Sequence, residues 1–294
     1  MLQHNNPEPR NPSRVVILGG SGFVGRALTA ELERLGAASL ALSSQDLNLL
    51  AAGAGAKLAG LLQPGDAVVV LAALTPDKGK GSGTLMQNLA MAQNVLQGLA
   101  QAQPAQVIYF SSDAVYSFDE ALIKDQTPAC PIDLYGAMHR TRELMFLAEV
   151  KAPLAILRST LVYGAGDSHN SYGPNRFRRM AREQGKITLF GQGEETRDHI
   201  LVEDLAALVG QVLTHCSSGT INAATGRSAS FREVAQLVAD QFGGAVSVEG
   251  TPRANPITYR AFDPIALQMA FPTFCFTPLE EGIARVHQQT AQGE

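Results

Sequence analysis

The chain of 294 residues contains no tryptophan and only three cysteines. Cys130, Cys216 and Cys275 are odd in number and far apart, and the six histidines show no metal-ligand spacing with them. We therefore expect neither a disulfide framework nor a metal site.

An excess of positive charge and long apolar runs are absent as well. The net charge is -4 and the isoelectric point is near 5.9, so no extended basic surface is available for nucleic acid or an anionic membrane. No apolar run reaches the roughly 18 to 20 residues of a membrane span. Residues 1–13 are polar and lack the apolar core of a signal peptide. We expect a disordered leader at residues 1–13 of a cytoplasmic protein that binds neither nucleic acid nor membrane.

The chain does have the apolar content for a large core, with 45% hydrophobic and 17% charged residues. Short apolar segments typical of buried strands alternate with segments of helical periodicity. The expected strands are 15–18, 39–42, 67–71, 106–110 and 154–158, and the expected helices are 23–35, 58–62, 84–101 and 135–150. This alternation predicts a doubly wound parallel α/β sheet of the Rossmann type, with its site at the carboxyl ends of the strands.

A glycine-rich turn joins the first predicted strand to the first predicted helix. Gly19, Gly22 and Gly25 lack side chains, so the backbone and the helix N-terminus can approach a pyrophosphate. The alternative is a tight turn that only packs helix on strand. Because the turn sits between a strand and a helix, a dinucleotide-binding role is favoured.

The spacing of these glycines is G-x-x-G-x-x-G. Together with Ser-Ser-Asp-Ala-Val-Tyr at 111–116 and with Tyr135-Gly136, it resembles the extended short-chain dehydrogenase/reductases, the NAD-dependent epimerase/dehydratase group that acts largely on nucleotide sugars. Further matching segments, at 157–164, 190–204 and 279–283, extend the resemblance over nearly all of the chain. It implies an NAD or NADP cofactor and a nucleotide-sugar substrate.

The pattern of strands and helices also predicts a division of the chain. After about residue 163 the alternation loosens, and a helix at 202–213, a strand at 220–222 and a helix at 231–242 follow. We expect a dinucleotide-binding Rossmann domain at 14–163, with 198–223 returning to it. Residues 164–197 and 224–294 are expected to form a small interleaved substrate lobe.

Cofactor contacts are implied at the glycine-rich turn and at the ends of later strands. The implied residues are Gly19, Ser21, Gly22, Phe23, Val24, Gly25, Ser43, Asp46, Leu47, Leu71, Ala72, Ala73, Asn88, Tyr135 and His139. An acidic residue after the second strand would bind a ribose 2'-hydroxyl and repel a 2'-phosphate. Ser43 and Ser44 do neither, so the choice between NAD and NADP stays open.

Catalysis is implied for Ser112, Tyr135 and His139. A tyrosine with a pKa near 10 is a poor base at neutral pH, so it needs a neighbouring positive charge. The family places a lysine four residues after the tyrosine, on the same helix face, where this chain has His139. Ser112 would donate to the substrate oxygen; its alternative role is that of a strand-end turn residue.

The histidine leaves two alternatives open. An imidazole is shorter than a lysine side chain, and its usual pKa near 6.5 leaves most of it uncharged at neutral pH. In one alternative it bonds a ribose hydroxyl and is charged enough to activate Tyr135. In the other, the protein is an impaired cofactor-binding sensor or scaffold. Arg140, five residues after Tyr135, is expected to point away from it.

The family's dehydratases carry an acid pair after the catalytic hydroxyl, whereas here Ala114 follows Asp113. Similar epimerase/reductases place a cysteine after the serine pair, and it is absent. A 4-keto-deoxysugar reductase or a 4-epimerase remains, with segment 43–47 slightly more similar to the reductases.

Substrate contacts are expected from Asp113, Asn175, Arg197 and Arg253, since guanidinium groups can clamp a diphosphate bidentately. The helices at 84–101 and 135–150 carry more apolar surface than one sheet face needs, which favours a homodimer.

Overall fold

The computed structural model describes residues 2–167, 170–254 and 256–292. A seven-stranded sheet in the order β1-β11-β7-β5-β4-β2-β3 forms its centre. These strands are β1 (Gln3–His4), β2 (Arg14–Leu18), β3 (Ser39–Leu42), β4 (Asp66–Val70), β5 (Gln106–Ser112), β7 (Leu154–Ser159) and β11 (Ser217–Ala223). Neighbours from β11 to β3 are parallel, and β1 runs antiparallel to β11. The predicted parallel α/β fold is confirmed.

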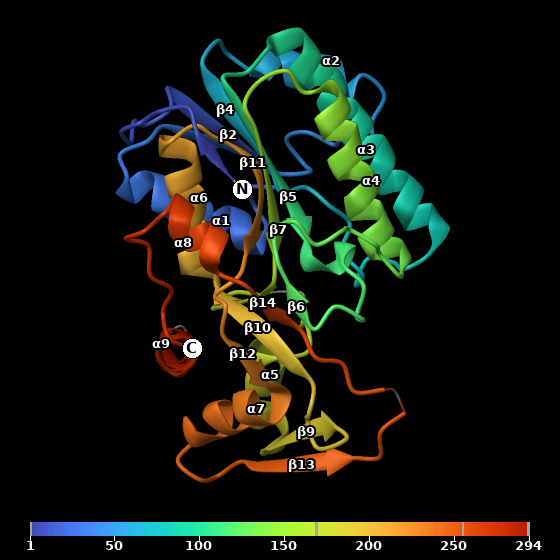
Figure 1. The fold of residues 1–294 in the computed structure, drawn as a ribbon, viewed down its shortest axis with the longest axis vertical. Helices are drawn as coiled ribbons and strands as arrows, with labels where there is room; N and C mark the ends of the chain where they lie inside the picture. The colour runs from blue at the N-terminus through green and yellow to red at the C-terminus, as the bar shows by residue number, and fades with distance from the viewer. Residues whose placement is uncertain (1, 168–169, 255, 293–294) are drawn as a thin grey trace.

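Helices cover both faces of this sheet (Figure 1). One face carries α1 (Phe23–Arg34) and α6 (Val202–Thr214), and the other carries α2 (Ala54–Leu61), α3 (Ser82–Ala102) and α4 (Leu134–Glu149). Successive side chains of β2 point to opposite faces of the sheet. Val15 and Ile17 pack in one apolar cluster, while Val16 and Leu18 pack in the other. A strand buried on both faces is apolar throughout, which explains the continuous run at its centre.

The amino-terminal segment is an edge strand, so the expectation of a disordered leader is wrong for it. The Nδ1 atom of His4 lies 2.8 Å from the Oγ atom of Ser217. The side chains of Asn5 and Asn6 donate to backbone carbonyls of the α6–β11 turn, at 2.6 and 3.0 Å. Polar side chains anchor this segment without an apolar pattern, which is why composition pointed to disorder.

The smaller lobe lies at the lower end of the molecule in Figure 1. Its sheets contain β8 (Leu161–Tyr163), β10 (Thr196–Leu201) and β12 (Ser228–Ser230), and separately β9 (Lys186–Phe190) with β13 (Ser247–Thr251). Its helices are α5 (Pro174–Gln184), α7 (Phe231–Asp240) and α9 (Leu279–Gln292). Phe177, Leu189 and Val234 lie in its core.

Short elements connect the two parts. The 3-10 turn η1 (Asp113–Val115) continues β5, and β6 (Leu122–Ile123) pairs with β14 (Ala261–Phe262). Helix α8 (Ile265–Ala270) returns to the large sheet, where Leu267 and Phe271 join the cluster under α6. The chain therefore differs from the expected division, which assigned all of 224–294 to the smaller lobe.

Within the part of the chain that the structure describes, no helix combines the length and the apolar character needed to cross a membrane.

Candidate active site

A pocket of about 1030 Å³ opens at the carboxyl ends of β2, β4, β5 and β7. The predicted site residues that line it are Gly19, Ser21, Gly22, Phe23, Val24, Gly25, Ser43, Leu47, Leu71, Ala72, Ala73, Ser112, Asp113, Tyr135, His139 and Arg197. Four others, Asp46, Asn88, Asn175 and Arg253, do not line it.

The glycine-rich turn forms one wall of the pocket. Gly19 has φ of +93°, a conformation that favours glycine, and a Cβ atom at Gly20 would lie 2.5 Å from the Cβ atom of Ala41. Gly22 caps α1 without a side-chain hydrogen bond, and the first turn holds no acidic residue. The N–H groups of that turn are therefore available to an anion, which fits a pyrophosphate.

Asp46 and Asn88 do not line the pocket themselves, but each forms hydrogen bonds with a loop that does. The Oδ2 atom of Asp46 accepts from the backbone N and the Oγ atom of Ser43, at 2.8 and 2.6 Å. The side chain of Asn88 is buried and bonds both backbone groups of Leu74, at 2.8 and 3.0 Å. These side chains fix the loops after β3 and β4, whose residues do line the pocket.

Ser112 and Tyr135 meet where α4 approaches the end of β5. A Cβ atom at Gly136 would clash with the carbonyl oxygen of Ala114, so only glycine lets the helix come this close. Asp133 caps α4 by accepting from the backbone N of Gly136 at 2.8 Å. Tyr135 is thereby brought within hydrogen-bond reach of Ser112.

Burial and the charge of Asp113 raise the pKa of Tyr135 to about 12, although the hydrogen bond with Ser112 lowers it. The phenol therefore holds its proton at neutral pH.

His139 is buried against Tyr135, with the two rings edge to face and their centroids 4.7 Å apart. Its Nδ1 atom lies 2.9 Å from the Oη atom of Tyr109. Burial, and next the charge of Arg142, lower the pKa of His139 to about 3. Burial therefore disfavours a charged imidazole at neutral pH, and the choice between the two alternatives for His139 stays a prediction.

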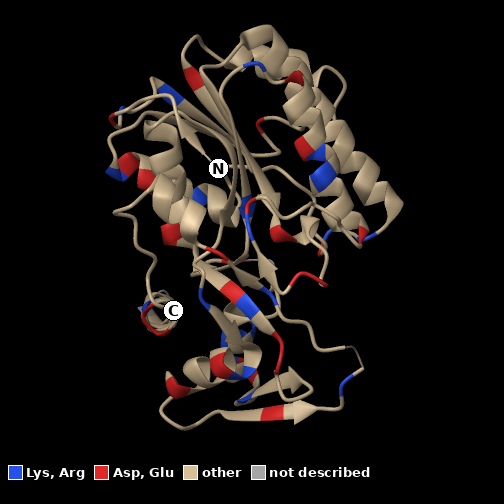
Figure 2. Cartoon of the chain, viewed as in Figure 1, with Lys and Arg blue, Asp and Glu red and all other residues tan. Residues whose placement is uncertain are grey.

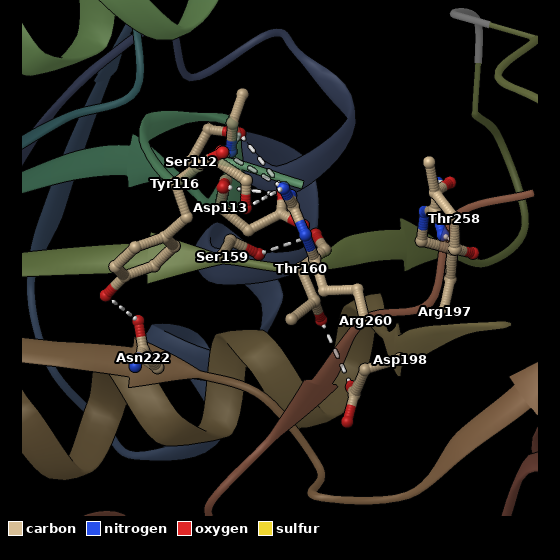
Figure 3. A network of polar contacts seen from close by, with 12 residues as sticks. Ser112, Asp113, Tyr116, Ser159, Thr160, Arg197, Asp198, Asn222, Thr258 and Arg260 are labelled. Atoms are coloured by element: carbon tan, nitrogen blue, oxygen red, sulfur yellow. Dashed lines mark hydrogen bonds and ion pairs between the residues drawn. The ribbon is translucent and has the colours of Figure 1, made fainter. Parts of the chain in front are cut away.

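A second wall carries two arginines (Figure 3). The Nη1 atom of Arg260 lies 3.0 Å from the Oδ2 atom of Asp113, and its guanidinium carbon lies 4.2 Å from the ring centroid of Phe118. Arg197 stacks on Phe118 as well, at 5.2 Å, and donates to the carbonyl of Thr258 at 3.0 Å. Of these two arginines, only Arg260 pairs with a carboxylate, that of Asp113, among the described residues. This wall is therefore attractive to an anion.

The structure places two of the predicted substrate-binding residues outside the pocket. Arg253 forms ion pairs with Glu194 and Glu195, at 2.6 and 2.5 Å. These two adjacent acidic residues lie on the loop before β10 and bind its guanidinium in place of a substrate. The buried Asn175 accepts from the backbone N of Gly164 at 3.1 Å, so it supports a loop. Neither side chain faces the pocket.

The sequence did not single out Arg260 or Arg142, both of which are buried. Two patterns could have found them. Arg260 lies two residues before the buried Phe262, on the same side of an extended segment. Arg142 follows Tyr135 by seven residues, which places it on the same helix face.

Comparisons with known proteins agree with this geometry. A model of the NAD-dependent epimerase/dehydratase family matches residues 15–224. The ADP-L-glycero-D-manno-heptose-6-epimerase of Alkalilimnicola ehrlichii is 26% identical, over 92% of this chain and 95% of that protein. The UDP-glucose 4-epimerase of Thermus thermophilus, solved with NAD, has a TM-score of 0.82 at 20% identity, covering 96% of this chain and all of that one. MoeE5 in complex with UDP-glucose and NAD has a TM-score of 0.80 at 23% identity, covering 95% of this chain and 99% of that one.

Proposed function

The chain belongs to the NAD-dependent epimerase/dehydratase family, and we propose that it is an NAD(P)-dependent oxidoreductase of nucleotide sugars, either a 4-keto-deoxysugar reductase or a 4-epimerase. The observation that carries the proposal is that Ser112 and Tyr135 share one pocket with the glycine-rich turn and with the arginines at 197 and 260. A site for a dinucleotide, a proton-exchanging group and a site for an anionic substrate are thereby combined.

The glycine-rich turn supports a dinucleotide cofactor, because its helix N-terminus is free to bind a pyrophosphate. Two solved neighbours hold NAD, which favours NAD here. Ser43 and Ser44 carry no charge that would repel a 2'-phosphate, so NADP is the second cofactor to test. The nicotinamide ring would supply or accept the hydride.

Tyr135 would exchange a proton with the substrate oxygen. Its protonated phenol is suited to donate to a carbonyl oxygen that becomes a hydroxyl, whereas oxidation of the hydroxyl requires a phenolate. The Oγ atom of Ser112 accepts from the backbone N of Ala114 at 3.1 Å and donates to the Oδ1 atom of Asp113 at 3.4 Å. Rotation of this O–H away from Asp113 would let it donate to the same substrate oxygen. A reductase needs Tyr135 only to donate a proton, whereas a 4-epimerase needs Tyr135 to accept a proton first and to donate it afterwards.

A calorimetric titration with NAD and NADP, followed by hydride exchange with a panel of 4-keto nucleotide sugars, tests this function. We expect one cofactor to bind and one sugar to be reduced. Tyr135→Phe should bind that cofactor equally well and slow the reduction at least ~100-fold. Cofactor binding without hydride exchange on any sugar would contradict the proposed enzymatic activity. It would support the impaired sensor or scaffold, which the neutral His139 favours.

The arginine wall is proposed to bind the diphosphate of the substrate. Arg260→Gln should weaken binding of a nucleoside diphosphate roughly 10- to 100-fold, as expected for loss of a hydrogen bond to a charged group. Arg253→Gln is the matched control, because that guanidinium pairs with Glu194 and Glu195 instead. Equal losses in the two variants would contradict this assignment.

We also propose a homodimer that buries α3 and α4. Helix α3 contains no charged residue (Figure 2), although its Met86 is 62% exposed. On the neighbouring α4, Leu144 and Leu147 are 51% and 54% exposed. An uncharged helix face with exposed large apolar side chains is typical of an interface between copies of one chain.

A further inference from the structure

Arg142 on α4 is the largest of the fully buried side chains. Its Nη2 atom donates to the carbonyl of Ala72 at 3.0 Å, and its Nη1 atom lies 3.5 Å from the Oδ1 atom of Asn88. Its guanidinium carbon lies 5.1 Å from the ring centroid of Tyr109. Among the described residues, no carboxylate pairs with it.

A cation buried without a counter-charge is unfavourable, because its desolvation costs several kcal/mol. The carbonyl, the amide oxygen and the aromatic face around Arg142 are neutral and compensate only in part. A methionine would fill similar space without this penalty. A charge retained in such a place therefore points to an electrostatic role beside a functional site.

Contacts connect this charge to Tyr135. The ring of Tyr109 stacks on Arg142, and its hydroxyl is hydrogen-bonded to His139, whose ring touches that of Tyr135. Tyr135, His139 and Arg142 follow at intervals of four and three residues, on one helix face. Helical side chains lean towards the N-terminus, so the guanidinium reaches back towards Tyr135.

The other charges around Tyr135 oppose its ionisation. Asp113 from η1 and Asp133 from the start of α4 raise its pKa, whereas the hydrogen bond with Ser112 and the charge of Arg142 lower it. The neutral His139 contributes no charge. The nearby Glu143 is engaged by Arg158, at 2.7 Å, and by Arg140.

We propose that Arg142 is a positioning residue that supplies the positive charge His139 lacks, and so favours transfer of the proton from Tyr135. The inference rests on the proposed function, since it takes Tyr135 as the proton-exchanging group. Arg142 touches neither substrate nor cofactor in this scheme; its charge acts on Tyr135 through space, across the packed rings of Tyr109 and residue 139.

The absence of tryptophan allows a direct test, because tyrosinate absorbance near 295 nm can be read without interference. Subtracting the titration of the matching Tyr135→Phe protein isolates Tyr135. The comparison is made in a His139→Lys background, where the lysine brings the pKa of Tyr135 down into the measurable range. There, Arg142→Gln should raise the pKa of Tyr135 by about one unit or more, as expected for loss of a nearby charge.

Arg142→Lys, which retains the charge, should restore the titration, and Arg140→Met is the control. The control also removes one positive charge from α4, but from a side chain that pairs with Glu143. It should leave the titration of Tyr135 unchanged. Arg142→Met provides a second neutral variant in case Arg142→Gln does not fold.

Hydride exchange gives the second readout. In the natural background and in the direction of sugar reduction, Arg142→Gln should move the alkaline fall of the rate to higher pH, and adding His139→Lys should move it back. A titration of Tyr135 that is the same with and without Arg142 would overturn the inference. A protein that exchanges no hydride with any sugar would contradict the proposed function alone, because the absorbance titration would still decide the role of Arg142.

Discussion

Two histidines, His139 and His199, keep their imidazole rings fully inside the protein. Burial lowers the pKa of His139 to about 3 and that of His199 to about 4, while an unfolded chain would titrate near 6.5. Below pH 6.5 the unfolded state therefore binds more protons than the folded state. The stability that these neutral rings contribute is complete above that pH and is lost as the pH falls towards 4.

His139→Gln should make unfolding less sensitive to acid. Between about pH 6 and pH 4.5 the free energy of unfolding of this variant should fall less steeply than that of the natural protein, by up to about 1.4 kcal/mol per pH unit. Urea titrations at several pH values measure it. Above pH 7.5 the imidazole is neutral in both states, so the difference between the two proteins should be constant there. Parallel curves down to pH 4.5 would show that His139 is not buried in its neutral form.

The sequence predicted some residues of this site and missed others. The family resemblance implied catalytic roles for Ser112 and Tyr135, and both residues line the pocket. The same resemblance implied a substrate contact for Arg253, but two acidic neighbours in space pair with its guanidinium. Arg142 and Arg260 did not stand out, because burial of an arginine depends on partners brought from distant segments.

At the scale of elements, the approach of α4 to η1 is the contact that assembles the candidate catalytic group. Gly136→Ala would place a methyl group against the carbonyl of Ala114. We expect a loss of roughly 1 to 3 kcal/mol of stability, as for other overpacked positions, together with a weaker Ser112–Tyr135 contact. Urea unfolding measures the first effect, and the pH dependence of hydride exchange measures the second.

Gly60→Ala provides the matched control, since Gly60 lies in α2 with open space where its Cβ atom would be. It should gain as much as about 1 kcal/mol from better helix propensity. If both alanines stabilised the protein, the close packing of α4 on η1 would be refuted.

Elements with strong periodicity were predictable, and elements defined by their partners were not. The helix expected at 135–150 is observed as Leu134–Glu149, and the strand expected at 39–42 is observed as Ser39–Leu42. The short pairs β9–β13 and β6–β14 join segments that are far apart in sequence. Each strand is too short for its own alternation to be distinctive, so its pairing depends on the rest of the fold.

For the whole molecule, the proposed α3–α4 interface predicts a dimer that one charge can disrupt. Leu147→Glu should convert the protein to a monomer, because it would place like charges face to face across a two-fold interface. Light scattering after size-exclusion chromatography measures the mass. Met269→Glu is the control, since Met269 is 66% exposed on α8, outside α3 and α4. A natural protein that elutes as a monomer would contradict the proposal.

The parallel order of the large sheet followed from the alternation of strands and helices, because a parallel neighbour requires a crossover helix. The alternation did not predict the path of the chain after residue 223. Helix α8 returns to the large sheet through Leu267 and Phe271, and such apolar residues fit either core equally well. Only the shape of the space under α6 decides between the two cores.

The edge strand β1 also determines when, during synthesis of the chain, the large sheet can be completed. His4 lies 213 residues before its partner Ser217. At a synthesis rate of 5 to 20 residues per second, roughly 10 to 40 seconds separate the appearance of the two strands at the ribosome. During that interval the amino-terminal segment has no strand to pair with. Among the described strands of this sheet, β1 therefore pairs only after β11, the last of them in sequence, has emerged.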